Sequence, residues 1–355
     1  MLLAVGVAVV AAACGASNDD NSTSSAAPAA SDTSGGAAST AAAGPKLKVG
    51  LATDQGGLND KGFNQLAFQG ATKAKDELGI DLTVKESKSE ADYVPNLSYF
   101  CDNNFDVIIA IGFLMAPTVG QLAPKCTHSK FAIVDNSVVG DPINGAPNVT
   151  GLLFKEQEVG YLVGYLAGLV AKNNVKINGA KAVSTVGGLK IPPVDRFIAG
   201  FQKGATDADP GIKTLNGYSN DFVKQAKCKE TALNQIAQGS VVEFQVAGQC
   251  GLGVLDASHE KGIFGIGVDA DQGYLGPWVM TSALKRVDVA VYNAIQAANH
   301  GTLKGGANKQ FSASIGGVGY GKWSSKVPAS IKSAVAAQFV KLKAGQIKGI
   351  PTTVK

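Results

Sequence analysis

The sequence is poor in histidine and lacks the complete motif of a phosphate-binding loop. It has only three histidines, His128, His259 and His300, and they stand at no spacing that favours a shared metal ion. No complete phosphate-binding loop of the Gly-x-x-x-x-Gly-Lys-Ser/Thr type occurs in it. The formal net charge is +4 over 355 residues, a small excess that gives no reason to expect a nucleic-acid groove. We therefore predict no metal site, no cofactor and no nucleic-acid partner.

Apolar runs long enough to span a bilayer are missing at the N-terminus. Residues 2–13 are apolar, but the run is too short for a membrane span and ends in small residues before Cys14. This pattern is typical of a signal peptide, and the residues around Cys14 resemble a bacterial lipobox, in which the cysteine is lipidated. We therefore predict a lipoprotein signal peptide over 1–14 and an anchor on the extracytoplasmic face of the cell membrane. The alternative is an apolar N-terminus without a signal.

Residues 15–45 consist mainly of Ser, Thr, Ala, Gly and Asp, with little to bury. We interpret this segment as a flexible tether.

After the tether, short β-branched runs alternate with amphipathic stretches, which predicts βαβ units. Because the chain exceeds one ordinary core, we expect an α/β fold with two doubly wound parallel-sheet lobes. The expected strands are 47–52, 81–86, 106–111, 130–134, 180–186, 212–217, 241–246, 263–267 and 278–282. The expected helices are 60–78, 91–103, 115–123, 155–172, 194–208, 221–238, 251–261, 284–300 and 328–344.

The chain is expected to cross between the lobes three times. The first crossing is assigned to 147–154, the second follows Gly273 to Pro277, and the third covers 311–318. The N-terminal lobe would then comprise 46–150 plus 277–305, and the C-terminal lobe 151–276 plus 306–355. Three hinge crossings would allow the lobes to close on a ligand.

Four cysteines remain after Cys14, an even number that suggests disulfides in an exported chain. They allow three pairings. We favour Cys101 with Cys126 and Cys228 with Cys250, because each of these bridges stays within one lobe.

The loop DQGGLNDKGFNQ, residues 54–65, directly follows the first expected strand. In open α/β sheets, ligands bind beyond the carboxyl ends of the strands. Asp54 lies at this strand end, and Phe63 flanked by Asp60 and Asn64 could grip a flat molecule that forms hydrogen bonds. A simpler interpretation is equally compatible: Phe63 belongs to the core, and Asn59 or Asp60 caps the next helix.

Other candidates also follow expected strands. Asp135 either caps a turn or accepts hydrogen bonds from a ligand, and Asp269 belongs to a carboxylate pair with Asp271. Phe222 occupies in the second lobe the kind of position that Phe63 occupies in the first, so the two rings could sandwich a planar ligand. Gly248 opens a glycine-rich stretch that fails the dinucleotide fingerprint, and we interpret it as a close backbone approach.

The loop at 54–65 resembles the N-terminal signature of the basic membrane lipoprotein family, the solute-binding proteins of nucleoside ABC transporters. Six further stretches match this family in the same order, and together the matches cover about residues 46 to 300. They are GFLM (112–115), FAIVD (131–135), FKEQE (154–158), GG with IPPVDRF (187–197), GIGVDADQ (265–272) and TSALKRVD (281–288).

The resemblance implies a type I periplasmic-binding-protein fold that captures a purine nucleoside for an ABC importer, with the ABC permease as partner and a monomeric state. By motif position, Phe63 and Phe222 would stack on the base, and its polar edge would be read by Asp54, Asn64 and Asp135. Asp269, Lys285 and the backbone at Gly248 would hold the ribose, since a carboxylate can accept from both hydroxyls of a diol. Cys250 departs from the family pattern, and a disulfide there would stiffen the ribose side.

Two alternatives remain. The same fold could bind a different small ligand, such as a sugar, a nucleobase or an aromatic signal, because fold does not fix function. The other alternative is a nucleoside hydrolase, which would need a clustered set of carboxylates such as Asp54 with Asp60 or Asp269 with Asp271. No histidine lies in a motif, so we expect a binding protein rather than an enzyme.

Overall fold

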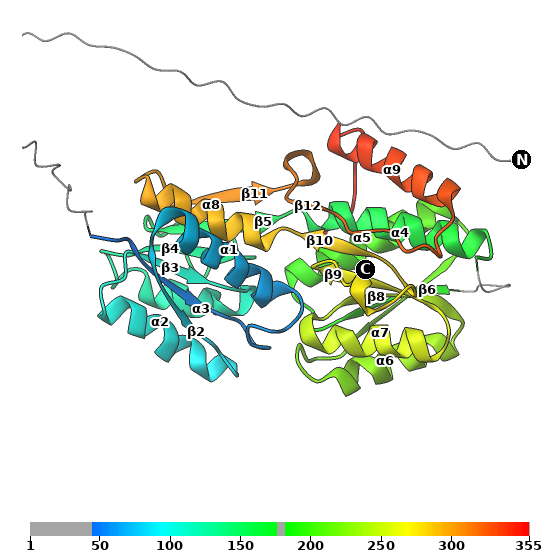
Figure 1. The fold of residues 1–355 in the computed structure, drawn as a ribbon, viewed down its shortest axis with the longest axis horizontal. Helices are drawn as coiled ribbons and strands as arrows, with labels where there is room; N and C mark the ends of the chain where they lie inside the picture. The colour runs from blue at the N-terminus through cyan, green and yellow to red at the C-terminus, as the bar shows by residue number, and fades with distance from the viewer. Residues whose placement is uncertain (1–44, 176–181, 355) are drawn as a thin grey trace, which may run out of the picture. The chain divides into compact units, whose positions relative to one another are not determined.

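Two six-stranded sheets organise the chain in the computed structural model, which describes residues 45–175 and 182–354 (Figure 1). The order is β11-β5-β4-β3-β1-β2 in the first sheet and β12-β10-β9-β8-β6-β7 in the second, so one arrangement is used twice. Neighbouring strands are parallel except β10 and β12. The predicted α/β class with two parallel-sheet lobes is confirmed. The predicted signal peptide, Cys14 and the tether up to residue 44 lie outside the described residues.

The central strands of each sheet have the apolar composition that a parallel sheet covered on both faces requires, whereas the edge strands β2, β7 and β11 are more polar. The first sheet contains β1 (Lys48–Ala52), β2 (Asp81–Lys85), β3 (Val107–Ala110), β4 (Lys130–Val134), β5 (Val149–Phe154) and β11 (Ala307–Phe311). The second contains β6 (Ala182–Gly187), β7 (Lys213–Tyr218), β8 (Ser240–Val246), β9 (Phe264–Asp269), β10 (Val279–Lys285) and β12 (Val318–Tyr320). Central strands such as β3 and β9 are buried along their whole length.

Helices cover both faces of each sheet (Figure 1). In the first lobe they are α1 (Phe63–Leu78), α2 (Tyr93–Asp102), α3 (Ala116–Leu122) and α8 (Val287–Asn299), with α1 packed on α8. In the second lobe they are α4 (Glu156–Lys172), α5 (Pro192–Ala208), α6 (Gln225–Ala237), α7 (Leu252–Glu260) and α9 (Ala329–Lys343). None of the described helices has the length and apolarity that crossing a membrane would need.

The described strands and helices lie within Pro45 to Lys355, which forms one compact unit with its own buried core. The core cluster draws residues from both sheets. This body therefore contains all the described strands and helices and their core.

The chain passes between the sheets three times, as predicted, although the first crossing lies after β5 rather than at 147–154. Two further strands belong to a different lobe than expected. The segment 278–282 was expected in the first lobe, yet β10 pairs with β9 in the second sheet, and the chain crosses only after Lys285. Residues 307–311 were expected in the second lobe, yet β11 pairs with β5 in the first. A strand pattern shows that a segment will pair but does not show with which neighbour, and this explains both differences.

The start of α6 also differs from the prediction. The helix was expected from residue 221 but begins at Gln225, because residues 219–224 form a loop. Asp221 closes this loop by accepting hydrogen bonds from the backbone N–H groups of Val223 and Lys224, both at 2.9 Å. Side chains that bond the local backbone in this way favour a turn over a helix.

The structure contains the two disulfides that the lobe argument favours. Cys101 is joined to Cys126, and Cys228 to Cys250, with Cα atoms 5.6 Å apart in each pair. The first bridge ties α2 to the turn after α3, and the second ties α6 to the short helical turn η3 (Gly248–Gly251).

Candidate functional site

A cavity of about 70 Å³ lies between the two lobes. This is smaller than the roughly 300–1,000 Å³ that is usual for small-ligand pockets. The structure brings all nine candidate ligand residues to its wall: Asp54, Asp60, Phe63, Asn64, Asp135, Phe222, Gly248, Asp269 and Lys285. Most stand at or just beyond the carboxyl ends of parallel strands, which explains why sequence patterns could find them.

Two of these residues, Asp60 and Asn64, have most of their polar atoms occupied within the protein. The Asp60 carboxylate accepts hydrogen bonds from the backbone N–H groups of Gly62, Asn64 and Gln65 at 2.8–3.1 Å. Asn64 accepts from the Asp54 amide at 3.0 Å and donates to the Gln55 carbonyl at 2.9 Å. Asp60 therefore holds the start of α1, and Asn64 fixes the loop that carries Asp54.

Asp54 presents one carboxylate oxygen to the cavity side. Its Oδ1 accepts hydrogen bonds from the Tyr93 hydroxyl and from the Gln55 amide. Its Oδ2 lies where a side chain on Gly112 would be, since a Cβ there would come within 2.3 Å of that oxygen. Burial raises the pKa of Asp54 to about 6, and the hydrogen bond from Tyr93 opposes this rise. Tyr93 is buried on α2 and does not line the cavity, so it orients Asp54 from behind.

Lys285 and Asp135 form a buried ion pair that joins the lobes. The Lys285 ammonium, at the end of β10, lies 2.6 and 2.7 Å from the two Asp135 oxygens beyond β4. It also lies 3.1 Å from Glu156, which contacts Arg196 at 3.5 Å. Burial lowers the pKa of Lys285, but these carboxylates outweigh it and hold the pKa above the usual lysine value.

The ion pair changes how two predicted roles fit together. The resemblance assigns Asp135 to the base edge and Lys285 to the ribose, yet the two groups are in contact. They therefore belong to the same end of the cavity. Glu156, in the first turn of α4, is fully buried and pairs with Lys285 as well.

Asp269 is the buried carboxylate of the cavity wall that is left without a partner. Within the described part of the chain its carboxylate takes part in no hydrogen bond or ion pair, although only 7% of the residue is exposed. Burial raises its pKa to about 7, against the opposing effect of Lys285. Asp135 and Asp269 also have φ angles of 71° and 61°, a conformation that non-glycine residues rarely adopt. Such strained residues cluster at functional sites.

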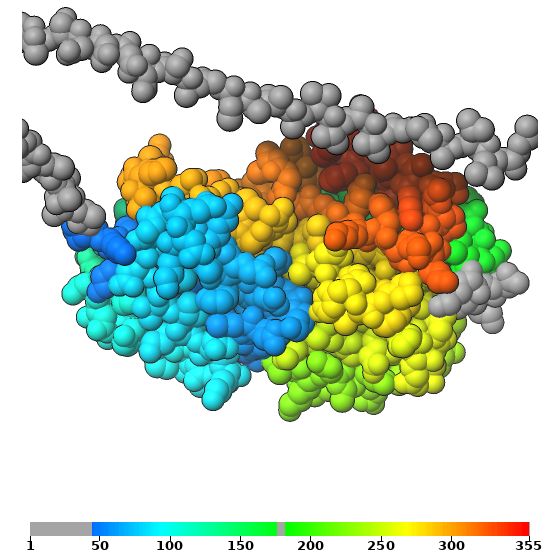
Figure 2. Space-filling view, viewed as in Figure 1, coloured from blue at the N-terminus to red at the C-terminus, as the bar shows by residue number. Residues whose placement is uncertain are grey.

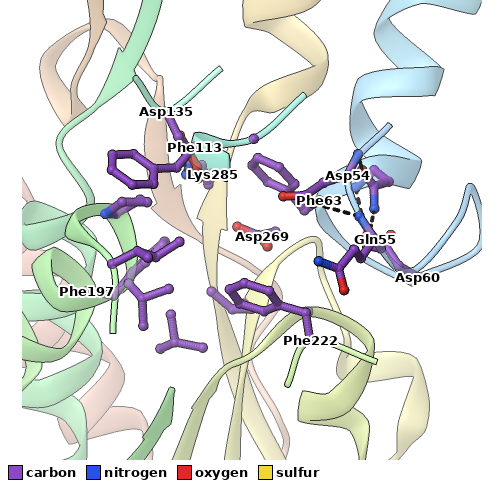
Figure 3. Close-up of a pocket in the computed structure, with 18 residues that line it drawn as sticks. Asp54, Gln55, Asp60, Phe63, Phe113, Asp135, Phe197, Phe222, Asp269 and Lys285 are labelled. Carbon is purple, nitrogen blue, oxygen red and sulfur yellow. Dashed lines mark hydrogen bonds and ion pairs between the residues drawn. The ribbon is translucent and has the colours of Figure 1, made fainter. Parts of the chain in front are cut away.

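Aromatic rings line the cavity from both lobes. Figure 3 shows Phe63 of α1 and Phe222 of the 219–224 loop on opposite sides of Asp269. Phe113 and Phe197 also contribute to the wall. Sequence reasoning placed these two in family motifs but did not single them out, because an aromatic residue at a helix start is usually part of the core.

The lobes touch each other around the cavity. Besides the Lys285–Asp135 pair, the Gln272 side-chain amide donates to the Lys61 carbonyl across the lobes at 3.2 Å. In Figure 2, atoms of the first lobe (blue and cyan) and of the second (green to yellow) meet along a seam. The two lobes are therefore in contact beside the cavity rather than held apart.

The cavity wall combines carboxylates, one lysine and apolar rings. Among the described residues, no group of three or more histidine, cysteine or acidic side chains is arranged to hold a metal ion. Asp271, the expected partner of Asp269, lines a different groove, and its carboxylate accepts from the backbone N–H groups of Gly273 and Lys322.

Comparisons with known proteins agree with this architecture. A family model described as "ABC transporter substrate-binding protein PnrA-like" matches residues 46–350. The ABC transporter nucleoside-binding protein BmpA of Lactococcus lactis subsp. cremoris is 30% identical over 323 residues, which cover 85% of this chain and 88% of that protein. The CD4+ T-cell-stimulating antigen of Listeria monocytogenes is 32% identical over 322 residues, with 84% and 87% covered.

A solved structure is similar over nearly the same extent. It is an ABC transporter solute-binding protein from Aeropyrum pernix, with a TM-score of 0.77 and 29% identity. The similarity covers 86% of this chain and 94% of that one.

Proposed function

Because this chain belongs to the family of PnrA-like substrate-binding proteins of ABC transporters, we propose that its interlobe cavity captures a purine nucleoside for import. One observation carries the proposal. Each lobe supplies an aromatic ring, Phe63 or Phe222, and the unpaired carboxylate of Asp269 lies with them in the same cavity. Rings on opposing lobes suit a flat base, and a free buried carboxylate suits a diol.

The proposed roles follow from which atoms are still free. The base stacks between Phe63 and Phe222, and Asp54 Oδ2 accepts from a donor on its edge, since Oδ1 is already bonded. Asn64 retains one amide hydrogen for the same edge. The ribose hydroxyls donate to Asp269, and Gly248 provides a backbone surface without a side chain.

Lys285 and Asp135 form an ion pair in the wall of the site. Because Lys285 is held by Asp135 and Glu156 at 2.6–3.1 Å, it contacts the ligand with its position already fixed. The four aspartates on the cavity wall outnumber this single lysine. A neutral ligand rich in hydrogen-bond donors fits that balance better than an anion such as a nucleotide.

The site supports binding without chemical change. A hydrolase would need free, clustered carboxylates, but Asp60 is saturated by backbone amides and Asp271 belongs to another groove. We therefore keep the proposal of a non-enzymatic binding protein.

The cellular setting is proposed from relatives and from the N-terminus. Relatives of this chain are named lipoproteins and basic membrane proteins, and Cys14 is the expected lipidation site. We propose an extracytoplasmic, membrane-anchored monomer that delivers its ligand to an ABC permease. If Cys14 carries the anchor, Cys14→Ser should move the protein from the detergent phase to the aqueous phase in a phase-partition assay. A variant that stays in the detergent phase would contradict this assignment.

The first experiment is a thermal-shift screen of the body from residue 46, followed by calorimetry on each hit. Binding to the folded state alone stabilises by about 2.7 kcal/mol at a hundredfold excess over Kd, so a true ligand is visible. Adenosine, guanosine and inosine should raise the melting temperature, free bases less, and ribose not at all. A response to sugars or amino acids alone would overturn the nucleoside proposal while leaving the family assignment intact.

A matched variant separates the two ends of the ligand. Asp269→Ala should weaken the binding of nucleosides much more than the binding of free bases, because only nucleosides carry the diol. Equal losses for both ligand types would remove Asp269 from the ribose site.

A further inference from the structure

The disulfide between Cys228 and Cys250 joins the two second-lobe segments that carry Phe222 and Gly248. Phe222 lies in the 219–224 loop, which leads directly into the first turn of α6, where Cys228 stands. Gly248 opens η3, and Cys250 follows two residues later in the same turn. Phe222 and Gly248 both line the cavity, whereas both cysteines are fully buried behind it.

A backbone hydrogen bond links the disulfide directly to Phe222. The N–H of Cys250 donates to the carbonyl oxygen of Phe222 at 2.9 Å. Cys250 is thus joined to Cys228 of α6 by the disulfide and to Phe222 by a hydrogen bond.

The Phe222 ring lies against the backbone of Gly188. A Cβ on Gly188 would come within 2.3 Å of the Phe222 ring, so the ring occupies the space where a side chain would otherwise stand. Loop residues Ser219 and Asn220 donate their amides to the carbonyls of Gly187 and Gly188, both at 2.9 Å. These contacts fix one end of the loop, and the disulfide fixes the other.

We propose that the Cys228–Cys250 disulfide positions Phe222 for ligand stacking, an inference that rests on the proposed function of the cavity. Without the bond, η3 and the first turn of α6 are held together by non-covalent contacts alone, and the 219–224 loop that leads into α6 gains freedom. Part of the binding free energy must then order the loop. Preorganisation of a binding loop raises affinity by removing that cost.

The other disulfide provides a matched control. Cys101 and Cys126 are 25 residues apart in sequence, and Cys228 and Cys250 are 22 apart, so the chain-entropy effects of the two bridges are similar. Neither end of the Cys101–Cys126 bridge lines the cavity. Removing it should cost stability without moving Phe222.

The test compares Cys228→Ala/Cys250→Ala with Cys101→Ala/Cys126→Ala in the body from residue 46. Both double variants should melt at lower temperature than the parent. Only Cys228→Ala/Cys250→Ala should weaken nucleoside binding. Its Kd should rise about three- to tenfold, the effect expected from the cost of ordering one side chain. Hydrogen exchange without ligand should become faster at residues 219–224 and 248–251 in that variant alone.

The result that overturns the inference is an unchanged Kd in Cys228→Ala/Cys250→Ala, or equal weakening in both double variants. If that variant does not fold, parent protein with and without dithiothreitol replaces it, with free thiols counted. Unchanged exchange at 219–224 after reduction would then overturn the inference. A parent that binds no nucleoside refutes the proposed function instead, and the exchange comparison still decides the role of the disulfide.

Discussion

Asp269 should make ligand affinity depend on pH near neutrality. Burial raises its pKa to about 7 in the ligand-free protein. A vicinal diol needs the ionised carboxylate, because it donates two O–H groups to it. As the pH falls through 7, the protein takes up a proton at Asp269, and the ligand must displace that proton before it binds.

The size of the effect follows from proton linkage. The apparent Kd is multiplied by one plus the ratio of protonated to ionised Asp269, which is about 1.1 at pH 8 and about 11 at pH 6. The affinity for a nucleoside should therefore fall about tenfold between pH 8 and pH 6, or about 1.4 kcal/mol. Asp54, with a pKa raised by burial to about 6, adds roughly a factor of two at pH 6.

Titration calorimetry at pH 6, 7 and 8 measures this directly. Binding at pH 7 should release about half a proton, which is detected by repeating the titration in buffers of different ionisation enthalpy. The free base is the internal control, because it lacks the diol and should show only the smaller dependence due to Asp54. Asp269→Asn cannot titrate, so its nucleoside profile should be nearly flat. An equal slope in Asp269→Asn, or an affinity that rises as the pH falls, would refute the reasoning.

Three further predictions use other contacts. Phe222→Ala should weaken nucleoside binding by about 1–3 kcal/mol in calorimetry, the worth of one stacked base, while an unchanged Kd would take Phe222 out of the site. Tyr93→Phe removes the hydroxyl that stabilises ionised Asp54 and so should raise the pKa of Asp54. The part of the pH dependence of Kd that is due to Asp54 should then shift to higher pH, and an unshifted dependence would contradict the positioning role. Glu243 is fully buried on β8, and burial raises its pKa to about 8 against the opposing effect of the nearby Ser240 and Ser184 hydroxyls. Because only the unfolded state ionises it at pH 7, Glu243→Gln should raise the free energy of unfolding by up to about 3 kcal/mol at pH 7 and by less at pH 5. Equal gains at both pH values in denaturant titrations would count against it.

Much of the site could be predicted because ligand residues in this fold stand at strand ends. The end of an apolar run is a local feature of sequence, and parallel strands bring such ends to one edge of the sheet. Asp54, Asp135, Phe222 and Asp269 were all found in this way, and all line the cavity. The resemblance to a family then added Lys285, which stands at the end of β10.

Which polar atoms remain free could not be predicted. Asp60 and Asn64 are polar residues of the same loop as Asp54, yet their hydrogen bonds go mainly to backbone groups. The sequence left both a capping and a ligand role open for Asp60. Only the folded loop shows which donors reach its carboxylate.

The sequence by itself determined the alternation of strands and helices, the two repeated lobes and the positions from which a ligand could be held, since these depend on patterns only a few residues long. The tertiary structure decided the rest. It placed β10 in the second sheet, so that Lys285 meets Asp135, which lies 150 residues earlier in the chain. Among the described residues, it also left the Asp269 carboxylate without a partner in the same cavity. Contacts of this kind depend on how two sheets pack against each other. No pattern a few residues long encodes a contact between residues so far apart in the chain.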